Sequence, residues 1–267
     1  MRLAEGRLLE RHGRWPEDVE VRLIDASASA DDLARMQETL DASERQRAGR
    51  YRLQADRERF VCTRYALRTV LAGYTGCEPA ALRFRQGARG KPFLEDHPGL
   101  SFNASHSGGH GLIAVSARRS VGVDIEHVNA GVDWHAIADL VCSAQEQRII
   151  EDARADQRRA HFYRIWTAKE ALVKALGLGI GDDLASISVH VAAGSPQRPA
   201  VATGSEFAAA AALKYRWIDE VEGHAACVAF GDDNARPAFT SSSSVQESGP
   251  ARAAETSLLR QPPPSAR

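Results

Sequence analysis

Apolar residues recur at helical spacing in the first part of the chain and then give way to short extended runs. A strand over 19–27 leads into a helical segment over 31–51, and a longer helix follows over 54–76. The apolar side chains that we expect to reach the core from this longer helix are Phe60, Tyr65, Leu67 and Leu71. Extended runs come next, over 82–84, 91–96, 100–105, 112–117 and 121–128.

The second part of the chain repeats this order. Ser143 followed by Glu146 forms a capping box that predicts a short helix, and a long helix is predicted from about Asp156 to Leu176. Strands are expected after it, over 186–192, 213–218 and 224–230. The repeat predicts an α+β fold of two similar halves, each with a long helix packed on a small sheet, and indicates an internal duplication. We place the halves at 1–118 and 119–233.

Residues 234–267 have a different composition from the rest of the chain. They are rich in Ser, Pro, Ala and Gly and carry no periodic apolar stripe. Such a segment cannot bury enough apolar surface to order itself, so we expect a disordered tail. A tail that docks onto a partner is the alternative, although few anchoring side chains are available for it.

Composition excludes several classes of protein. With 267 residues, of which 43% are hydrophobic, the chain can bury a large core and is long enough to be an enzyme. Its net charge of −1 gives no overall field to attract nucleic acid, and it contains no run of 18 apolar residues that could span a membrane. The first 18 residues carry scattered charges and no cleavage site, so we expect a soluble, cytoplasmic protein.

Acidic and basic residues on one strand and one helix are the first candidates for chemistry. Asp124 and Glu126 lie two residues apart on a predicted strand, so both carboxylates leave the same face, about 6.6 Å apart. On the long helix, Glu170 and Lys174 share a face at roughly 6 Å, and Lys169 is next to Glu170. Three carboxylates and nearby lysines suit Mg²⁺ and phosphate, with Glu170 as a candidate base. Solvated acids on an edge strand and a solvated Glu-Lys pair are the structural alternatives.

The stretch 90–111 and an arginine cluster supply further candidates. Lys91 follows a glycine, and Asn103, Ser105 and His106 end a predicted strand. Ser105 and His106 could belong to a hydrolase, but the sequence around them lacks the G-x-S-x-G elbow of such enzymes. His106 and His110 are spaced like zinc ligands, but no helix is predicted to carry them. A histidine with a purely structural role is the default interpretation. The cluster contains Arg45, Arg47, Arg50, Arg52, Arg57 and Arg59. It is either a solvated helix face or a site that grips a phosphate monoester.

Four segments, taken in order, resemble a known family. GKP (90–92), FNASHS (102–107), GVDIE (122–126) and WTAKEALVKALGLG (166–179) resemble the signature blocks of 4'-phosphopantetheinyl transferases of the large, surfactin-synthetase-activating (Sfp) type. The resemblance spans residues 40 to 182, with fitting order and spacing. It implies an enzyme that moves 4'-phosphopantetheine from coenzyme A to a serine hydroxyl of an acyl or peptidyl carrier protein and releases adenosine 3',5'-bisphosphate.

The resemblance also implies a fold and roles for individual residues. The two halves would be related by a pseudo-twofold axis with coenzyme A between them, and a monomer would suffice. Asp124, Glu126 and Glu170 would hold Mg²⁺ on the pyrophosphate, Lys174 would contact that pyrophosphate, and Glu170 would be the base. For the rest of coenzyme A, the 3'-phosphate would be bound by His106 and Arg59 with Arg45 or Arg47, and the nucleotide portion by Lys91 and Ser105. Lys169 belongs to the motif without an assigned role.

The resemblance also implies a protein partner, and two other functions are alternatives to the transferase. Carrier proteins of this type are generally acidic, so basic surface near the active-site mouth, including part of the arginine cluster, could steer the encounter. A non-catalytic module that binds coenzyme A or a carrier protein is the main alternative function. RNA binding through the arginine-rich helix is a third hypothesis, but it lacks aromatic platforms and a basic overall charge. The fatty-acid, polyketide or peptide pathway served is not specified by the sequence.

Overall fold

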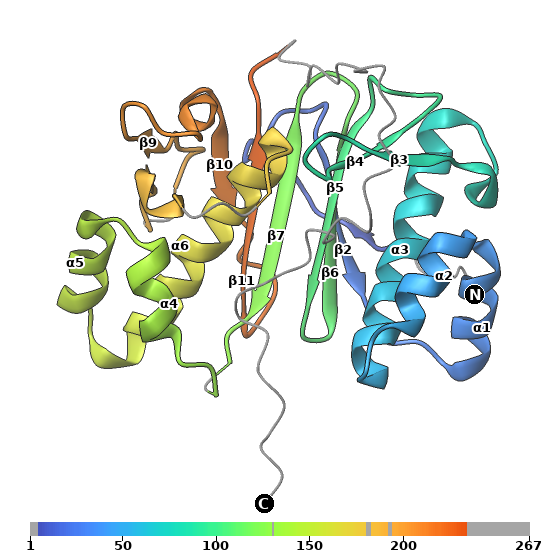
Figure 1. The fold of residues 1–267 in the computed structure, drawn as a ribbon, viewed down its shortest axis with the longest axis horizontal. Helices are drawn as coiled ribbons and strands as arrows, with labels where there is room; N and C mark the ends of the chain where they lie inside the picture. Colours follow the sequence, from blue (N-terminus) through green and yellow to red (C-terminus); the bar gives the residue numbers. More distant parts are fainter. Residues whose placement is uncertain (1–4, 130, 180–182, 192–193, 234–267) are drawn as a thin grey trace, which may run out of the picture.

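Two small antiparallel sheets lie next to each other in the middle of the protein, and each is covered on its outer side by a long helix (Figure 1). The computed structural model describes residues 5–129, 131–179, 183–191 and 194–233. The predicted mixture of helices and small sheets is confirmed. Within the described ranges, no helix has both the length and the apolar character needed to cross a membrane.

The first sheet is built from the N-terminal part of the chain, in the order β1-β2-β6-β5. Its strands are β1 (Arg7–Leu8), β2 (Glu20–Asp25), β5 (Ser101–Ser107) and β6 (His110–Ser116). The helices at its side are α1 (Ala30–Thr39), α2 (Ala42–Gly49) and α3 (Gln54–Thr75). Between α3 and β5 the chain forms the short helix η1 (Pro79–Ala81) and a hairpin of β3 (Phe84–Gln86) and β4 (Pro92–Leu94).

The second sheet has the order β10-β11-β7. Its strands are β7 (Val121–His127), β10 (Lys214–Trp217) and β11 (His224–Phe230). The helices at its side are α4 (Trp134–Val141), α5 (Ala144–Asp152) and α6 (Ala155–Leu176). Between α6 and β10 lie η2 (Leu184–Ser186), β8 (Ile187–Ser188), β9 (Ala200–Val201) and η3 (Ala208–Ala212). In each sheet some strands precede the helices in the chain, β1 and β2 in the first and β7 in the second, and the other strands follow the helices.

The two long helices match the prediction closely. Each ends at a glycine with a left-handed backbone, Gly76 at φ 71° and Gly177 at φ 74°, a conformation that costs glycine little. Phe60, Leu67 and Leu71 of α3 are buried as predicted, and Tyr65 is half-buried. Burial of each large apolar side chain contributes about 1.5–3 kcal/mol. Leu67 and Leu71 thereby fix α3 on its sheet, whereas Phe60 packs with α1 and α2.

Two predicted elements were wrong in extent. The helical segment expected over 31–51 is two helices, because Leu40 is extended and Asp41 caps α2. The strand expected over 186–192 is shorter, since only Ile187–Ser188 is paired and residues 192–193 lie outside the described residues. The expected tail, 234–267, also lies outside them.

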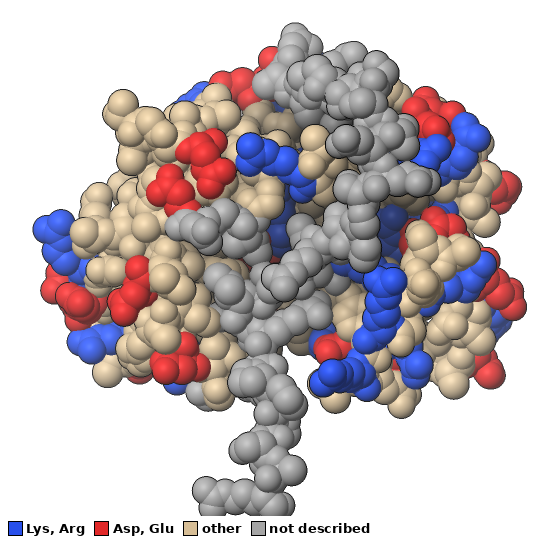
Figure 2. Space-filling view, in the orientation of Figure 1, with Lys and Arg blue, Asp and Glu red and all other residues tan. Residues whose placement is uncertain are grey.

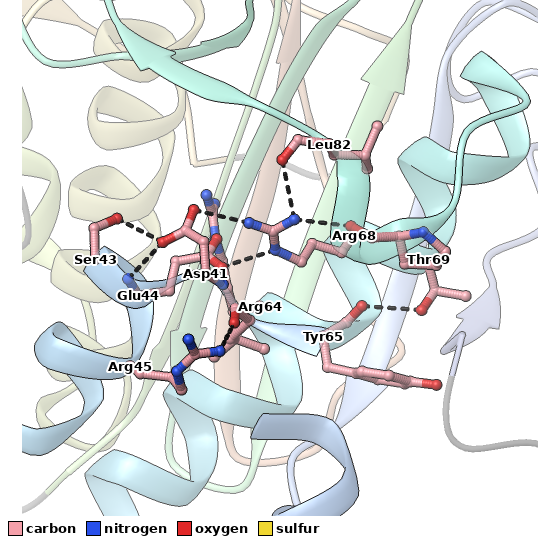
Figure 3. Close-up of polar contacts among 11 residues, drawn as sticks. Asp41, Ser43, Glu44, Arg45, Arg64, Tyr65, Arg68, Thr69 and Leu82 are labelled. Carbon is pink, nitrogen blue, oxygen red and sulfur yellow. Dashed lines mark hydrogen bonds and ion pairs between the residues drawn. The ribbon is translucent and has the colours of Figure 1, made fainter. Parts of the chain in front are cut away.

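A cluster of charged side chains joins α2 to α3 in the N-terminal part of the protein (Figure 3). Glu44 closes the capping box of α2 and accepts hydrogen bonds from Arg64 and, at 2.7 Å, from Arg68 of α3. Arg68, which is fully buried, also donates to Asp41 at 2.9 Å and to the carbonyl of Leu82 at 3.1 Å. The guanidinium therefore ties α3 to the cap of α2 and to the chain beyond η1.

The C-terminal part contains a similar cluster. Glu146 closes the capping box of α5, and the fully buried Lys169 of α6 donates to it at 2.6 Å. The same ammonium donates to the carbonyls of Val141, at 2.6 Å, and Leu184, at 3.1 Å. In both parts a capping glutamate binds a cation from the following long helix. Lys169, which had no predicted role, thus anchors α6 against the elements on either side of it.

Polar side chains, rather than a backbone ladder, join the two sheets along β5 and β7. Ser101 Oγ accepts a hydrogen bond from the amide of Val121 at 3.1 Å, and Asn103 Oδ1 accepts one from the amide of Val123 at 2.9 Å. The partners advance in the same direction, so the two strands run parallel along this junction (Figure 1). The alternate residues of β5 therefore hold the two parts of the protein together.

Candidate active site

Three buried carboxylates lie beside this junction. Asp124 and Glu126 leave one face of β7, while Val123 and Ile125 on the other face pack in the core between the sheets. Glu170 lies on α6, which packs along β7. Asp124, Glu126 and Glu170 are only 1%, 9% and 3% exposed. This burial excludes the alternative of solvated acids on an edge strand.

Lys174 brings a positive charge to these carboxylates. Its ammonium donates to Asp124 Oδ1 at 2.6 Å and lies 3.8 Å from Glu170 Oε2. Burial alone would lower the pKa of Lys174, but the facing carboxylates of Asp124 and Glu170 outweigh it and raise that pKa. Lys174 is therefore charged, and it bridges the strand and the helix.

Glu170 has a strongly perturbed pKa. Burial raises the pKa of Glu170 to about 8; the charge of Lys174 opposes this rise, and Asp124 and Glu126 add to it. A carboxyl group with this pKa is a stronger base, once ionised, than an ordinary glutamate. The carboxyl group of Glu170 is therefore suited to accept a proton or to bind a cation together with its neighbours.

Two serines of β5 orient the carboxylates of β7. Ser105 Oγ donates to Asp124 Oδ1 at 2.8 Å, and Ser107 Oγ donates to Glu126 Oε2 at 2.8 Å. Ser107 also accepts the amide of His127 at 3.1 Å. Ser107 was missed at the sequence level, although its place in the alternation of residues 101, 103, 105 and 107 was the available signal.

The site offers oxygen ligands to a cation. Asp124 Oδ2 and Glu170 Oε1 are buried without a hydrogen-bond partner among the described residues. Buried carboxylate oxygens without donors are costly unless a cation or proton joins them, and hard oxygen ligands suit Mg²⁺. As the side chains stand, no three His, Cys, Asp or Glu residues in the described ranges gather around one point for a metal ion. Because the ammonium of Lys174 bridges Asp124 and Glu170, it has to move away before these two carboxylates can bind a metal ion.

Comparison with known proteins gives this geometry a context. Residues 120–229 match the family model described as the 4'-phosphopantetheinyl transferase superfamily, and residues 27–118 match that of the 4'-phosphopantetheinyl transferase N-terminal region. The chain is 31% identical over 169 residues to a 4'-phosphopantetheinyl transferase of Bacillus subtilis, covering 63% of this chain and 74% of that protein. This chain belongs to the 4'-phosphopantetheinyl transferase family.

Two cyanobacterial members of the family are also similar. The 4'-phosphopantetheinyl transferase HetI of Nostoc is 38% identical over 145 residues, which cover 53% of this chain. A putative 4'-phosphopantetheinyl transferase of Synechocystis is 38% identical over 150 residues, which cover 55% of this chain. In each case the match spans 61% of the length of the relative.

Lys91, which the family resemblance assigns to the nucleotide, is buried in the structure. Its ammonium donates to the carbonyls of Val121 at 2.9 Å and Ala175 at 3.1 Å, and its stem packs on Gly177. Lys91 therefore joins the loop before β4 to the start of β7 and the end of α6. Its contact with the nucleotide stays a prediction.

The buried ammonium of Lys91 predicts a pH dependence of stability. Burial lowers the pKa of Lys91 from 10.5 to about 7. Between these values the unfolded chain holds more protons than the folded one, so the free energy of unfolding rises with pH, by up to about 1.4 kcal/mol per unit. In urea unfolding, Lys91→Met should remove this rise between about pH 7 and pH 9. Lys214→Met, which alters a half-buried lysine at the surface, should keep this rise. An equal rise in all three proteins would contradict the assignment.

The residues expected to bind the 3'-phosphate lie in the N-terminal part. Arg59 of α3 donates to Asp56 and to the carbonyl of Gly108, in the turn between β5 and β6, and His106 is half-buried on β5 near that turn. Arg47 lies over the ring of Phe60 at 5.3 Å. Arg45 donates to the carbonyl of Leu40 and is exposed. The structure thus brings Arg59 and His106 to one turn, whereas Arg45 and Arg47 lie on α2.

Proposed function

We propose that this protein transfers 4'-phosphopantetheine from coenzyme A to a serine hydroxyl of an apo acyl or peptidyl carrier protein, with Mg²⁺, and releases adenosine 3',5'-bisphosphate. The observation that carries the proposal is the buried group of Asp124, Glu170 and Lys174, since carboxylates and an ammonium are the groups that phosphoryl transfer needs. Membership of the transferase family supports the same reaction.

Each residue of the site has a part in this reaction. Glu170 takes the proton of the attacking hydroxyl as the oxygen-phosphorus bond to the carrier serine forms. Lys174 leaves Asp124 for the pyrophosphate and offsets the charge that grows as the phosphorus-oxygen bond to adenosine 3',5'-bisphosphate breaks. Asp124, Glu126 and Glu170 would hold Mg²⁺, which would supply positive charge against the pyrophosphate. Ser105 and Ser107 keep the two carboxylates of β7 in position.

The remaining part of the proposal concerns coenzyme A and the organisation of the protein. His106 and Arg59, with Arg45 or Arg47, bind the 3'-phosphate, and Lys91 and Ser105 lie along the nucleotide portion. The protein is of the large Sfp type, with halves at 1–118 and 119–233 related by a pseudo-twofold axis. It acts as a cytoplasmic monomer on acidic carrier proteins. The matching buried clusters of Glu44 with Arg68 and Glu146 with Lys169 support the relation between the halves.

Intact-protein mass spectrometry tests the reaction. An apo acyl carrier protein and an apo peptidyl carrier protein are incubated with this protein, coenzyme A and Mg²⁺. The expected result is a mass gain of one phosphopantetheine, lost when EDTA is added and restored by excess Mg²⁺. Coenzyme A binding without a mass gain on either carrier would instead support a non-catalytic binding module.

A further inference from the structure

Three histidines from three strands meet at one end of the two sheets. His110 begins β6, His127 ends β7 and His224 begins β11. The ring centroids of His110 and His224 are 4.9 Å apart, and those of His127 and His224 are 5.0 Å apart. Figure 1 shows the starts of β6 and β11 and the end of β7 at the lower ends of the sheets. We call His110, His127 and His224 the histidine trio.

The histidine trio lies on the opposite face of β7 from the carboxylates of the candidate active site. Side chains alternate between the two faces of a strand, so His127 shares a face with Val123 and Ile125. On β6 and β11 the same alternation places His110 and His224 in line with side chains of the core between the sheets. These core side chains are Leu112, Ala114, Ala226 and Val228. The trio therefore closes one end of this core, where β6 of the N-terminal part meets β7 and β11 of the C-terminal part.

Two ring nitrogens of the trio are buried without a partner. Nδ1 of His224 donates to the carbonyl of Glu222 at 2.9 Å, so Nε2 of the neutral ring carries a lone pair. This Nε2 and Nδ1 of His110 have no hydrogen-bond partner among the residues that the structure describes. A buried polar atom without a partner is costly. A backbone carbonyl that accepts from the other ring nitrogen is also typical of a histidine that binds a metal ion.

The turn between β5 and β6 leaves space beside the ring of His224. Gly108 in this turn has a φ of 59°, and a Cβ atom there would lie 2.6 Å from Nε2 of His224 and 3.1 Å from Cβ of His127. Both the backbone and the neighbouring rings therefore favour glycine at this position. The absence of a side chain at Gly108 keeps the turn clear of Nε2.

The separation of the rings matches that of two imidazoles on one metal ion. Zn²⁺ binds histidine nitrogen at about 2.0–2.1 Å, so two rings at tetrahedral positions have centroids about 5 Å apart. The separations of 4.9 and 5.0 Å agree with this value. As the side chains stand, three such donors do not meet at one point within the described ranges. The ring of His127, which is exposed, has to turn toward the ion.

The charges near the trio do not exclude a cation. Histidine is mostly neutral at pH 7 and then offers a lone pair. Asp25, which faces His110 in the register of β2 and β6, brings a negative charge to this end of the sheet. Arg59 binds a carbonyl of the hairpin turn, but Asp56 pairs with it. Figure 2 shows Lys and Arg atoms gathered at the lower right, where the N-terminal helices lie in Figure 1, rather than over the ends of the strands.

We infer that the histidine trio binds one divalent transition-metal ion of the class that prefers imidazole, with Zn²⁺ as the first candidate. Imidazole suits Zn²⁺, Ni²⁺ and Cu²⁺, whereas Mg²⁺ prefers oxygen, so the trio and the carboxylates select different ions. Purely structural packing is the alternative, because edge-to-face rings have similar separations. The two buried nitrogens favour the ion, since packing alone leaves them without a partner. The bound ion joins the N-terminal and C-terminal parts, and this role does not depend on the proposed function.

Zinc binding to the full chain without a polyhistidine tag tests the site. Isothermal titration with Zn²⁺ in excess Mg²⁺ should give one site, and Zn²⁺ at about a hundred times its Kd should raise the midpoint of thermal unfolding by about 5–10 °C. His224→Gln and His127→Gln should each raise this Kd at least about tenfold. His190→Gln, which alters an exposed histidine outside the trio, should leave it unchanged. Because His127 is exposed, its variant should fold, which keeps the test valid if His224→Gln is unstable.

A variant of the candidate active site distinguishes the two metal sites. Glu170→Gln should bind Zn²⁺ with the affinity of the unsubstituted protein. Zn²⁺ binding that is lost in Glu170→Gln but kept in His127→Gln would place the ion on the carboxylates and overturn the inference. It would also be overturned by the absence of Zn²⁺ binding to the unsubstituted protein, or by equal Kd values for His127→Gln and His190→Gln. No carrier protein or coenzyme A is present, so the result is separate from that of the mass test.

Discussion

Glu170→Gln is expected to lower phosphopantetheine transfer by at least about a hundredfold while coenzyme A still binds. Glutamine keeps the size of the side chain but has neither the negative charge that a cation needs nor the basicity that deprotonates a hydroxyl. The loss should appear in kcat in a carrier mass assay, whereas isothermal titration should give a Kd for coenzyme A near that of the unsubstituted protein.

A carboxylate on an exposed helix provides the control. Glu151 of α5 is exposed, and Glu151→Gln should leave both kcat and Kd unchanged. The buried position of Glu170 also allows the fold to be checked, because removing a buried charge should not lower the midpoint of thermal unfolding. Transfer by Glu170→Gln at the rate of the control would remove Glu170 from the roles of base and ligand together.

Lys174→Met is expected to bind Mn²⁺ more tightly than the unsubstituted protein when coenzyme A is absent, although it should transfer phosphopantetheine poorly. The ammonium lies 2.6 Å from Asp124 Oδ1 and 3.8 Å from Glu170 Oε2, so it competes with a divalent cation for both carboxylates. Two like charges at about 4 Å repel by about 4 kcal/mol at an effective dielectric constant of 20. Removing part of the repulsion between the ammonium and the cation should therefore tighten Mn²⁺ binding at least about tenfold.

Electron paramagnetic resonance of free Mn²⁺ during a titration measures the Mn²⁺ affinity directly, without any turnover. Lys214→Met is the matched control, because among the described residues Lys214 pairs only with the exposed Asp232, at 3.4 Å. The control should show the Mn²⁺ affinity of the unsubstituted protein. Weaker or unchanged Mn²⁺ binding in Lys174→Met would show that the lysine does not compete with the cation.

Sequence pattern predicted the elements that carry the site, although β7 is buried on both faces and α6 is buried on all sides over residues 165–173. The spacing of Asp124 and Glu126 on a strand was enough to predict their common face. The break between α1 and α2 was missed, although Asp41 followed by Glu44 has the same capping pattern that was read correctly at Ser143 and Glu146. Capping patterns of this kind were sufficient to locate the start of a helix where we applied them.

Other features depend on contacts between distant segments, which spacing does not encode. Lys169 is adjacent to Glu170 in a charged motif, yet its acceptors come from the ends of α4 and α5 and from η2. Lys91 likewise binds carbonyls of β7 and α6 that lie 30 and 84 residues away. A lysine next to a buried glutamate therefore looks the same in sequence whether it faces a binding site or the core.

The side-chain junction between β5 and β7 changes how similarity in this segment should be read in other members of the family. A backbone ladder accepts almost any side chain, but here Ser101, Asn103 and Ser107 must each supply a short polar group to the neighbouring strand. Replacing Ser101 or Asn103 by an apolar residue leaves a buried amide unsatisfied, at a cost of about 1–3 kcal/mol. Selection for folding alone would preserve this alternation, so a relative that had lost catalysis would retain it. Among distant relatives, we therefore expect the residues of β7 and α6, rather than the serines that face them, to separate enzymes from inactive descendants.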